Sequence, residues 1–281
     1  MLRTELHAVL FAALALIGLA VFSPTSAGTA LTVIDANGAK HTFPITDLLT
    51  HPAAETVAVA RDPAYGGTSS TYRAIPLARV LAGLPVSGAD ILEATALDGY
   101  VAQLPAVKGL STDPDAAVAY LAVEDPARPW PKRPGKEVSA GPYYVVWRNP
   151  ERSAVGPSAW PFQTVQLKLT GSVAKRFPQI AVPETLPADD PARHGQALFV
   201  NTCFSCHKMN GGGEATLGPD LNLPMNPTEY FQASVLPHFL RAPASVRHWP
   251  DQKMTSFTPD VLSDNDRDAI IAYLRHMVGR R

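Results

Sequence analysis

The five residues Cys203-Phe204-Ser205-Cys206-His207 place two thiols and an imidazole at the spacing that attaches c-type haem. Two cysteines separated by two residues reach the vinyl groups on one edge of a porphyrin and form thioether bonds. His207 then lies under the iron, where a neutral imidazole nitrogen is a suitable axial ligand. The sequence therefore predicts one covalently bound haem c.

Two other uses of a Cys-x-x-Cys pair fit the chain less well. The chain contains 2 cysteines, so a zinc site would lack a second pair of thiolate ligands. A thioredoxin-like redox pair is typical of a βαβ setting, whereas the residues around 203–207 favour helix and loop. Haem attachment is the preferred interpretation.

Helix signals lie on both sides of this motif. Asp190-Pro191 combines an N-cap residue with proline at the first helical position and predicts a helix that leads into the motif. Ser263 is a second N-cap residue, followed by acids that suit a helix N-terminus. Apolar side chains then recur at helical spacing until Gly279. Residues 191–281 are thus expected to form an all-α domain.

The front part of the chain reads as an α+β domain with a mainly antiparallel sheet. Asn37-Gly38 is a strong hairpin signal between the segment Leu31–Asp35 and a return through His41–Phe43. Further strands are predicted at 56–60, 91–96, 117–123, 142–148 and 162–170, with a short helix at 76–83. Four prolines in residues 176–191 predict a semi-extended linker. The expected organisation is a signal peptide (1–27), an α+β domain (28–175), a linker (176–190) and a helical domain (191–281).

Residues 191–281 resemble a class I cytochrome c. The resemblance is carried by Gly195-x-x-Leu198-Phe199 before the Cys-x-x-Cys-His motif, and by Gly218-Pro219-Asp220-Leu221, Met254-x-x-Phe257 and the segment Leu262 to Leu274 after it. It implies that Gly195, Phe199 and Tyr273 lie where the first and last helices cross. It also implies that Gly218-Pro219 lies beside His207, with a carbonyl that fixes the tautomer and orientation of the ring.

Met254 is the predicted axial ligand on the other side of the iron. It lies in a loop just before the last helix, and His/Met ligation raises the reduction potential. Met209 is too close to His207 in the chain to reach the opposite face, and Met277 lies on the apolar stripe, where a core role is expected. Three residues remain as alternatives: Met225, His238 and His248.

Residues 28–175 are similar to the molybdopterin-binding domain of the sulfite oxidase family. The residues that carry this similarity are Tyr72-Arg73-Ala74-Ile75-Pro76-Leu77, Leu97-Asp98-Gly99-Tyr100 and Gly141-Pro142. The catalytic domain of that family ligates molybdenum through a cysteine, which corresponds loosely to the segment Val57–Asp62. This chain has no cysteine there, so we expect no molybdenum cofactor and a docking or ligand-binding module instead.

The net charge of the chain and its distribution along the sequence say little about binding partners. The formal net charge is −1, and without a basic stripe nothing favours nucleic-acid binding. Arg241, Arg247 and Trp249 could bind haem propionates, although solvent exposure is the simpler prediction for each arginine.

The first residues read as an export signal, with Arg3, an apolar run over 9–22 and a cleavage region that ends at Ala27 or Ala30. The run is shorter than the about 20 residues of a spanning helix, so cleavage is preferred to a membrane anchor. The expected function is periplasmic electron transfer with a redox protein or dehydrogenase, by a protein that does not span the membrane after cleavage. Two alternatives are a haem-containing oxidoreductase subunit, whose front domain binds a substrate or cofactor, and a haem-based sensor.

Overall fold

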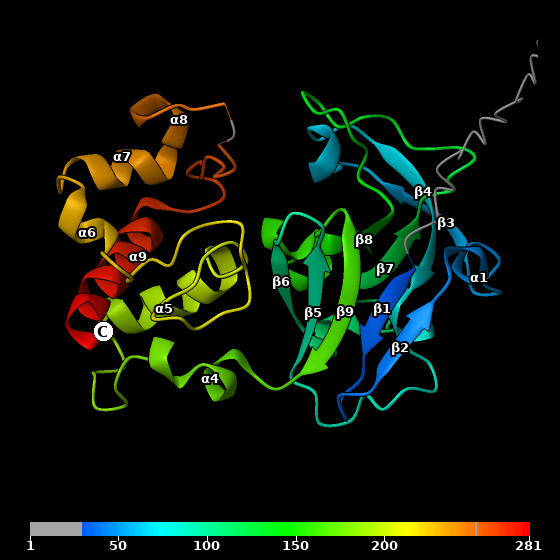
Figure 1. The fold of residues 1–281 in the computed structure, drawn as a ribbon, viewed down its shortest axis with the longest axis horizontal. Helices are drawn as coiled ribbons and strands as arrows, with labels where there is room; N and C mark the ends of the chain where they lie inside the picture. Colours follow the sequence, from blue (N-terminus) through cyan, green and yellow to red (C-terminus); the bar gives the residue numbers. More distant parts are fainter. Residues whose placement is uncertain (1–29, 251) are drawn as a thin grey trace, which may run out of the picture.

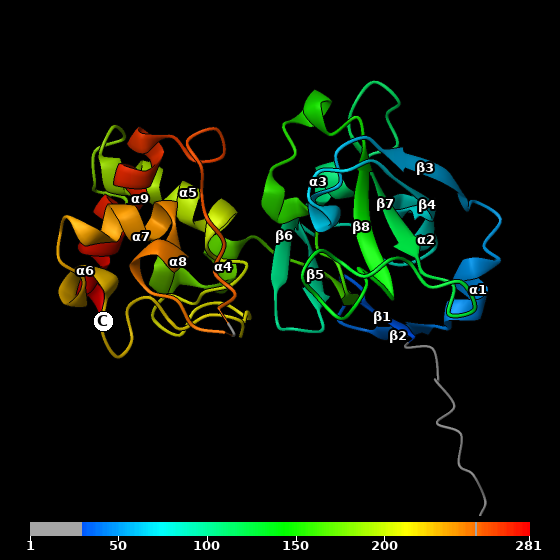
Figure 2. The same ribbon diagram turned by 90° about the horizontal axis from the view of Figure 1, so that it is seen from above.

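The structure, a computed structural model, describes residues 30–250 and 252–281. The described residues form a sheet-rich N-terminal region and a helical C-terminal region, which lie side by side in both views (Figures 1 and 2). The predicted signal peptide at 1–27 lies outside the described residues. Across 30–250 and 252–281, no helix has the length and apolar character needed to cross a membrane.

The regular secondary structure of the described N-terminal residues consists mainly of short strands, and three short helices lie between them. The strands are β1 (Leu31–Ile34), β2 (Lys40–Phe43), β3 (Glu55–Val59), β4 (Ser70–Pro76), β5 (Ile91–Ala96), β6 (Val101–Pro105), β7 (Val118–Val123), β8 (Tyr143–Arg148) and β9 (Thr164–Thr170). The helices are α1 (Ile45–Leu49), α2 (Leu77–Val80) and α3 (Ala106–Gly109). Short 3-10 turns lie at Pro63–Tyr65, Pro150–Ser153 and Pro157–Ala159.

The strands form two layers that share one junction. One layer has the order β6-β5-β9-β1-β2 and the other β8-β7-β4-β3. They meet where Tyr143 of β8 pairs with Thr164 of β9. Among the strand pairs of the described residues, β1 with β9 is parallel and the others are antiparallel. The prediction of a mainly antiparallel α+β region is therefore confirmed.

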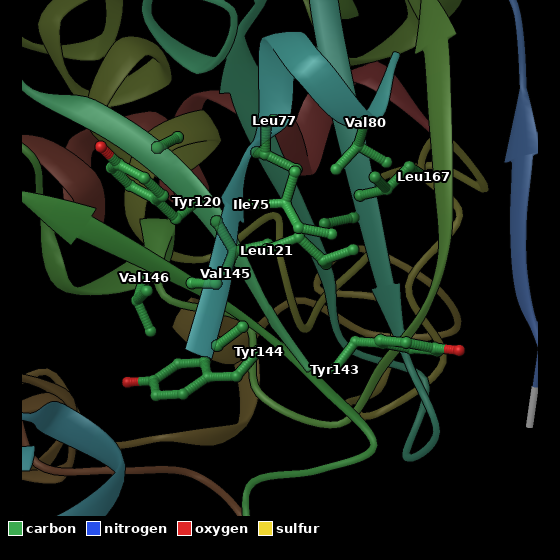
Figure 3. Packing of buried hydrophobic residues seen from close by; sticks show 14 of the residues in the cluster. Ile75, Leu77, Val80, Tyr120, Leu121, Tyr143, Tyr144, Val145, Val146 and Leu167 are labelled. Carbon is green, nitrogen blue, oxygen red and sulfur yellow. The ribbon is translucent and has the colours of Figure 1, made fainter. Parts of the chain in front are cut away.

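The buried hydrophobic cluster of this region includes side chains from both layers and from both faces of β8 (Figure 3). Leu121 of β7, Val145 of β8 and Leu167 of β9 are all fully buried. Burying an aliphatic side chain of this size contributes roughly 1.5–3 kcal/mol relative to leaving it exposed. The β7 and β8 strands are apolar along nearly their whole length because both of their faces are covered.

The C-terminal region consists of helices and loops. Its helices are α5 (Pro191–Thr202), α6 (Pro227–Tyr230), α7 (Val235–Arg241), α8 (Pro243–Val246) and α9 (Asp264–Met277), followed by a 3-10 turn at Val278–Arg280. Both predicted N-caps form: the Asp190 carboxylate accepts from the Ala192 amide at 2.8 Å, and the Ser263 hydroxyl accepts from the Asp266 amide at 3.1 Å. These caps fix the starts of α5 and α9.

The segment predicted as a linker is packed against the helical region. It follows α4 (Val173–Arg176) and contains a 3-10 turn at Pro178–Ile180. Ile180 and Val182 are buried in the same cluster as the core side chains of α5 and α9. The Tyr273 hydroxyl of α9 donates to the Ile180 carbonyl at 2.7 Å, so this part of the connection is structurally part of the helical region.

Candidate haem-attachment site

The crossing of α5 and α9 forms the base of the site. A Cβ atom on Gly195 would lie 2.0 Å from the Ala269 carbonyl oxygen and 2.8 Å from Tyr273 Cβ, so the two helices approach as closely as glycine allows. The Phe199 and Tyr273 rings pack beside this contact with centroids 5.2 Å apart. The three residues expected at the crossing are therefore brought together.

The Cys-x-x-Cys-His motif folds into a tight turn at the end of α5. The amides of Cys206 and His207 both donate to the Cys203 carbonyl, at 3.0 and 2.9 Å. Both cysteines are free thiols. Burial raises the pKa of Cys203 to about 12 and that of Cys206 to about 12, and the charge of Asp98 adds to the second shift. The turn thus presents two protonated thiols and one imidazole.

The ring of His207 is held by the segment Gly218-Pro219, as the resemblance to class I cytochrome c implied. Its Nδ1 lies 2.8 Å from the Pro219 carbonyl oxygen. A carbonyl only accepts, so Nδ1 carries the proton and the lone pair of Nε2 is left for a metal. A Cβ atom on Gly218 would lie 2.5 Å from His207 Cε1, so only glycine permits this approach. Burial also lowers the pKa of His207, which favours the neutral, ligating form.

Asp220 holds the loop that carries Pro219, a role that was not predicted from the sequence. Its carboxylate accepts from the amides of Asn210 at 3.1 Å, Asn222 at 2.8 Å and Leu223 at 3.0 Å, and from Gly211 at 2.6 Å. This fixes the position of the neighbouring carbonyl. Only the Gly-Pro-Asp-Leu run hinted at it in the sequence.

Buried asparagines join this loop to the end of α9. The Asn222 amide donates to the Met277 carbonyl at 2.7 Å, and the Asn226 amide donates to the Leu274 carbonyl at 2.9 Å. Both side chains are fully buried. They satisfy carbonyls that a helix C-terminus otherwise leaves unpaired.

Met254 lies partly buried, packed against the small cluster of Leu236, Leu240 and Ile271. Of the alternatives, Met225 is 50 % exposed, and His238 and His248 are exposed. Met277 is fully buried in the core, as predicted.

Arg241 was expected to be exposed to solvent, but its side chain is only 16 % exposed. Its guanidinium donates to the carbonyls of Phe257, at 2.7 Å, and Leu262, and pairs with Asp264 at 2.7 Å. It therefore fixes the chain between Met254 and α9, and the prediction of solvent exposure was wrong. Arg247, in contrast, is exposed.

This donor set fits haem c: two free thiols on one turn, and a neutral imidazole with its Nε2 lone pair available. Residues 192–277 match the cytochrome c family model. The match supports covalently bound haem c and electron transfer for this cytochrome c-like region. No curated protein matches the chain.

The turn between β5 and β6 rests directly on the attachment motif of the cytochrome c-like region. The Val101 amide donates to the Ser205 carbonyl at 2.9 Å, and the Thr216 amide donates to the Gly99 carbonyl at 3.1 Å. Burial raises the pKa of the Tyr100 hydroxyl, and a hydrogen bond from Ser205 opposes this rise. The N-terminal region therefore contacts Ser205, one of the two residues between the cysteines.

A charged network also joins the cytochrome c-like region to the sheet. Glu93 of β5 is 1 % exposed and pairs with Arg176 at 2.8 Å. Glu214, in the loop after the motif, pairs with Lys168 at 2.8 Å and with Arg176 at 3.2 Å. No local sequence pattern indicates this network, because its members lie far apart in the chain.

The segment Val57–Asp62, which corresponds loosely to the part of the sulfite oxidase family that carries the molybdenum-ligating cysteine, ends at a buried acid. Asp62 is fully buried, and its carboxylate accepts from the Tyr144 hydroxyl at 2.9 Å, the Ala64 amide at 2.9 Å and the Tyr72 hydroxyl. These hydrogen bonds commit the carboxylate to the core of the sheet region.

An open pocket of about 410 Å³ lies between the packed linker and α5, lined by residues such as Ile180, Arg193 and Val200. Its lining includes none of the predicted haem residues.

Proposed function

We propose that the protein is a periplasmic mono-haem c-type cytochrome that transfers single electrons between a redox enzyme, such as a dehydrogenase, and an acceptor. Cys203 and Cys206 would hold the haem covalently, with His207 and Met254 as its axial ligands. When bound, the haem supplies reversible one-electron chemistry at its iron. The observation that carries this proposal is the 2.8 Å hydrogen bond from His207 Nδ1 to Pro219, which leaves Nε2 available to a metal.

The roles of the chain follow from this assignment. Gly218 and Pro219 keep the ring in one orientation, in which His207 would bind the haem iron. His207 and Met254 would both ligate the iron, so no substrate would need to reach the metal. The N-terminal region would serve as a docking or ligand-binding module, and its similarity to the sulfite oxidase family remains a prediction.

Three measurements test this function on the full haem-loaded protein. We expect a reversible one-electron redox titration, no substrate turnover without an added partner, and slow binding of carbon monoxide to the ferrous form. A stoichiometric pterin or second metal would favour the oxidoreductase subunit instead. Fast binding of carbon monoxide to the wild type would favour the sensor.

Replacing Met254 with alanine is expected to open the sixth position of the iron. The ferric spectrum should change from low-spin to high-spin, and carbon monoxide should bind the ferrous form many-fold faster, because no protein atom competes for the metal. Absorption spectroscopy and stopped-flow mixing measure both effects. Met225→Ala is the matched control, because Met225 is a half-exposed methionine of the same region. An unaltered haem spectrum in Met254→Ala would refute the ligand assignment.

A further inference from the structure

The β5–β6 turn brings an acid of the N-terminal region to the haem-attachment motif. The Gly99 carbonyl in this turn accepts from the Thr216 amide at 3.1 Å. Two residues later, the Val101 amide donates to the Ser205 carbonyl at 2.9 Å. Asp98 lies beside these contacts, and its carboxylate accepts from the Tyr100 amide at 3.2 Å. The backbone that carries Asp98 is therefore fixed relative to Ser205 and its neighbour Cys206.

The contact at Gly99 leaves the turn little freedom to shift. A Cβ atom on Gly99 would lie 2.1 Å from the Thr216 hydroxyl oxygen, and the φ angle of Gly99 is +89°. A glycine is thus required both by the backbone conformation and by the closeness of the two regions. Beside it, the Tyr100 hydroxyl donates to the Ser158 carbonyl at 2.8 Å, and the Ser158 hydroxyl donates to the Asn201 carbonyl at 2.7 Å. The turn is therefore held by both regions.

The charge of Asp98 is not cancelled by an ion pair with any described residue. Asp98 interacts electrostatically with the Arg133 guanidinium and with the Cys206 thiol. Because an unpaired charge acts on whatever lies close to it, Asp98 should act on a group bound to Cys206.

We propose that Asp98, although it belongs to the N-terminal region, lowers the reduction potential of the haem held by Cys203, Cys206 and His207. This inference rests on the proposed function. Oxidation adds one positive charge at the iron, and a nearby carboxylate stabilises that charge relative to the ferrous state. The N-terminal region thus helps to set the driving force for electron transfer, in addition to any docking role. Asp98 is a tuning residue, and it does not ligate the metal.

Asp98→Asn tests this proposal, because asparagine keeps the oxygen that accepts from the Tyr100 amide and removes only the charge. We expect the equilibrium between ferric and ferrous haem to move about threefold toward the ferrous form, which is a potential about 30 mV more positive. Asp98→Lys should shift it further in the same direction. A spectroelectrochemical titration of each full-length variant measures both shifts.

Asp113→Asn is the matched control. Asp113 is an exposed acid of the same region, and its carboxylate accepts from the Asp115 amide at 2.9 Å in a turn of the same kind. We expect its potential to equal that of the wild type. Equal potentials for the wild type, Asp98→Asn and Asp98→Lys would overturn the proposal.

Hydrogen exchange and the ferric absorption spectrum separate electrostatics from structural change. The Val101 and Thr216 amides should stay as protected in Asp98→Asn as in the wild type, and the spectrum should be unchanged. Faster exchange at these amides would mean that the turn has detached, and would overturn the electrostatic explanation even if the potential shifts. Failure of the proposed function has a different result, since the wild type itself would then lack a low-spin haem.

Discussion

Gly195→Val is expected to destabilise the helical region by about 3 kcal/mol or more, because overpacking against backbone cannot be relieved by a side-chain rotation. The added Cβ would meet the Ala269 carbonyl oxygen at 2.0 Å, and that oxygen belongs to the backbone of α9. Relief therefore requires α5 and α9 to separate, which also pulls Phe199 away from Tyr273. Urea unfolding followed by far-ultraviolet circular dichroism measures the loss.

Ala197→Val is the matched control for this substitution. Ala197 belongs to the same helix but is exposed, so the added methyl groups meet solvent. Its cost should stay below about 0.7 kcal/mol, the upper end of the helix-propensity differences among ordinary residues. If Gly195→Val unfolded at the same urea concentration as Ala197→Val, the helices would not cross at Gly195.

Arg176→Ala is expected to cost about 3 kcal/mol, at the lower end of the range for breaking a buried ion pair. Glu93 is 1 % exposed, and the substitution removes the guanidinium that pairs with it at 2.8 Å. Lys168, at 3.6 Å, and the Gln103 amide, at 2.7 Å, compensate only part of the charge. The pair of Arg176 with Glu214 is lost as well. The same urea titration applies.

A double mutant separates buried charge from lost packing. Adding Glu93→Gln to Arg176→Ala should recover part of the stability, because a buried amide needs no counter-charge. No recovery would show that the cost comes from packing alone. Arg128→Ala serves as the exposed control: the side chain of Arg128 is 84 % exposed in its pair with Asp125, so its removal should cost about 0–1 kcal/mol.

Local patterns predicted the larger elements of the fold. The strands β3, β5, β7, β8 and β9 lie within a residue or two of the expected ranges, because their apolar runs are bounded by turn residues. The strands β4 and β6 were not predicted, since each is short or mixed in polarity and is stabilised by its neighbours in the sheet. The helices α6, α7 and α8 were also not predicted, because elements of 4 to 7 residues carry too little periodicity.

In the candidate site too, residues close together in the chain were predicted, and contacts between residues far apart in the chain were not. The motif of Cys203, Cys206 and His207 could be read directly because its residues are consecutive or nearly so. Arg241 was misjudged because its partners, up to 23 residues further on, are set by the path of a loop. The contact of Val101 with Ser205 joins residues separated by about a hundred positions, and no pattern in the chain indicates it.

The packed linker changes where a fragment of this protein should be cut. A fragment that begins at Pro191 would lack Ile180 and Val182, which share a core with α5 and α9. It would also lack the Ile180 carbonyl that accepts from the Tyr273 hydroxyl. Val173 belongs to the same cluster. The smallest piece that keeps the helical core intact therefore starts at or before Ser172 and includes α4, although the match to the cytochrome c family model begins only at residue 192.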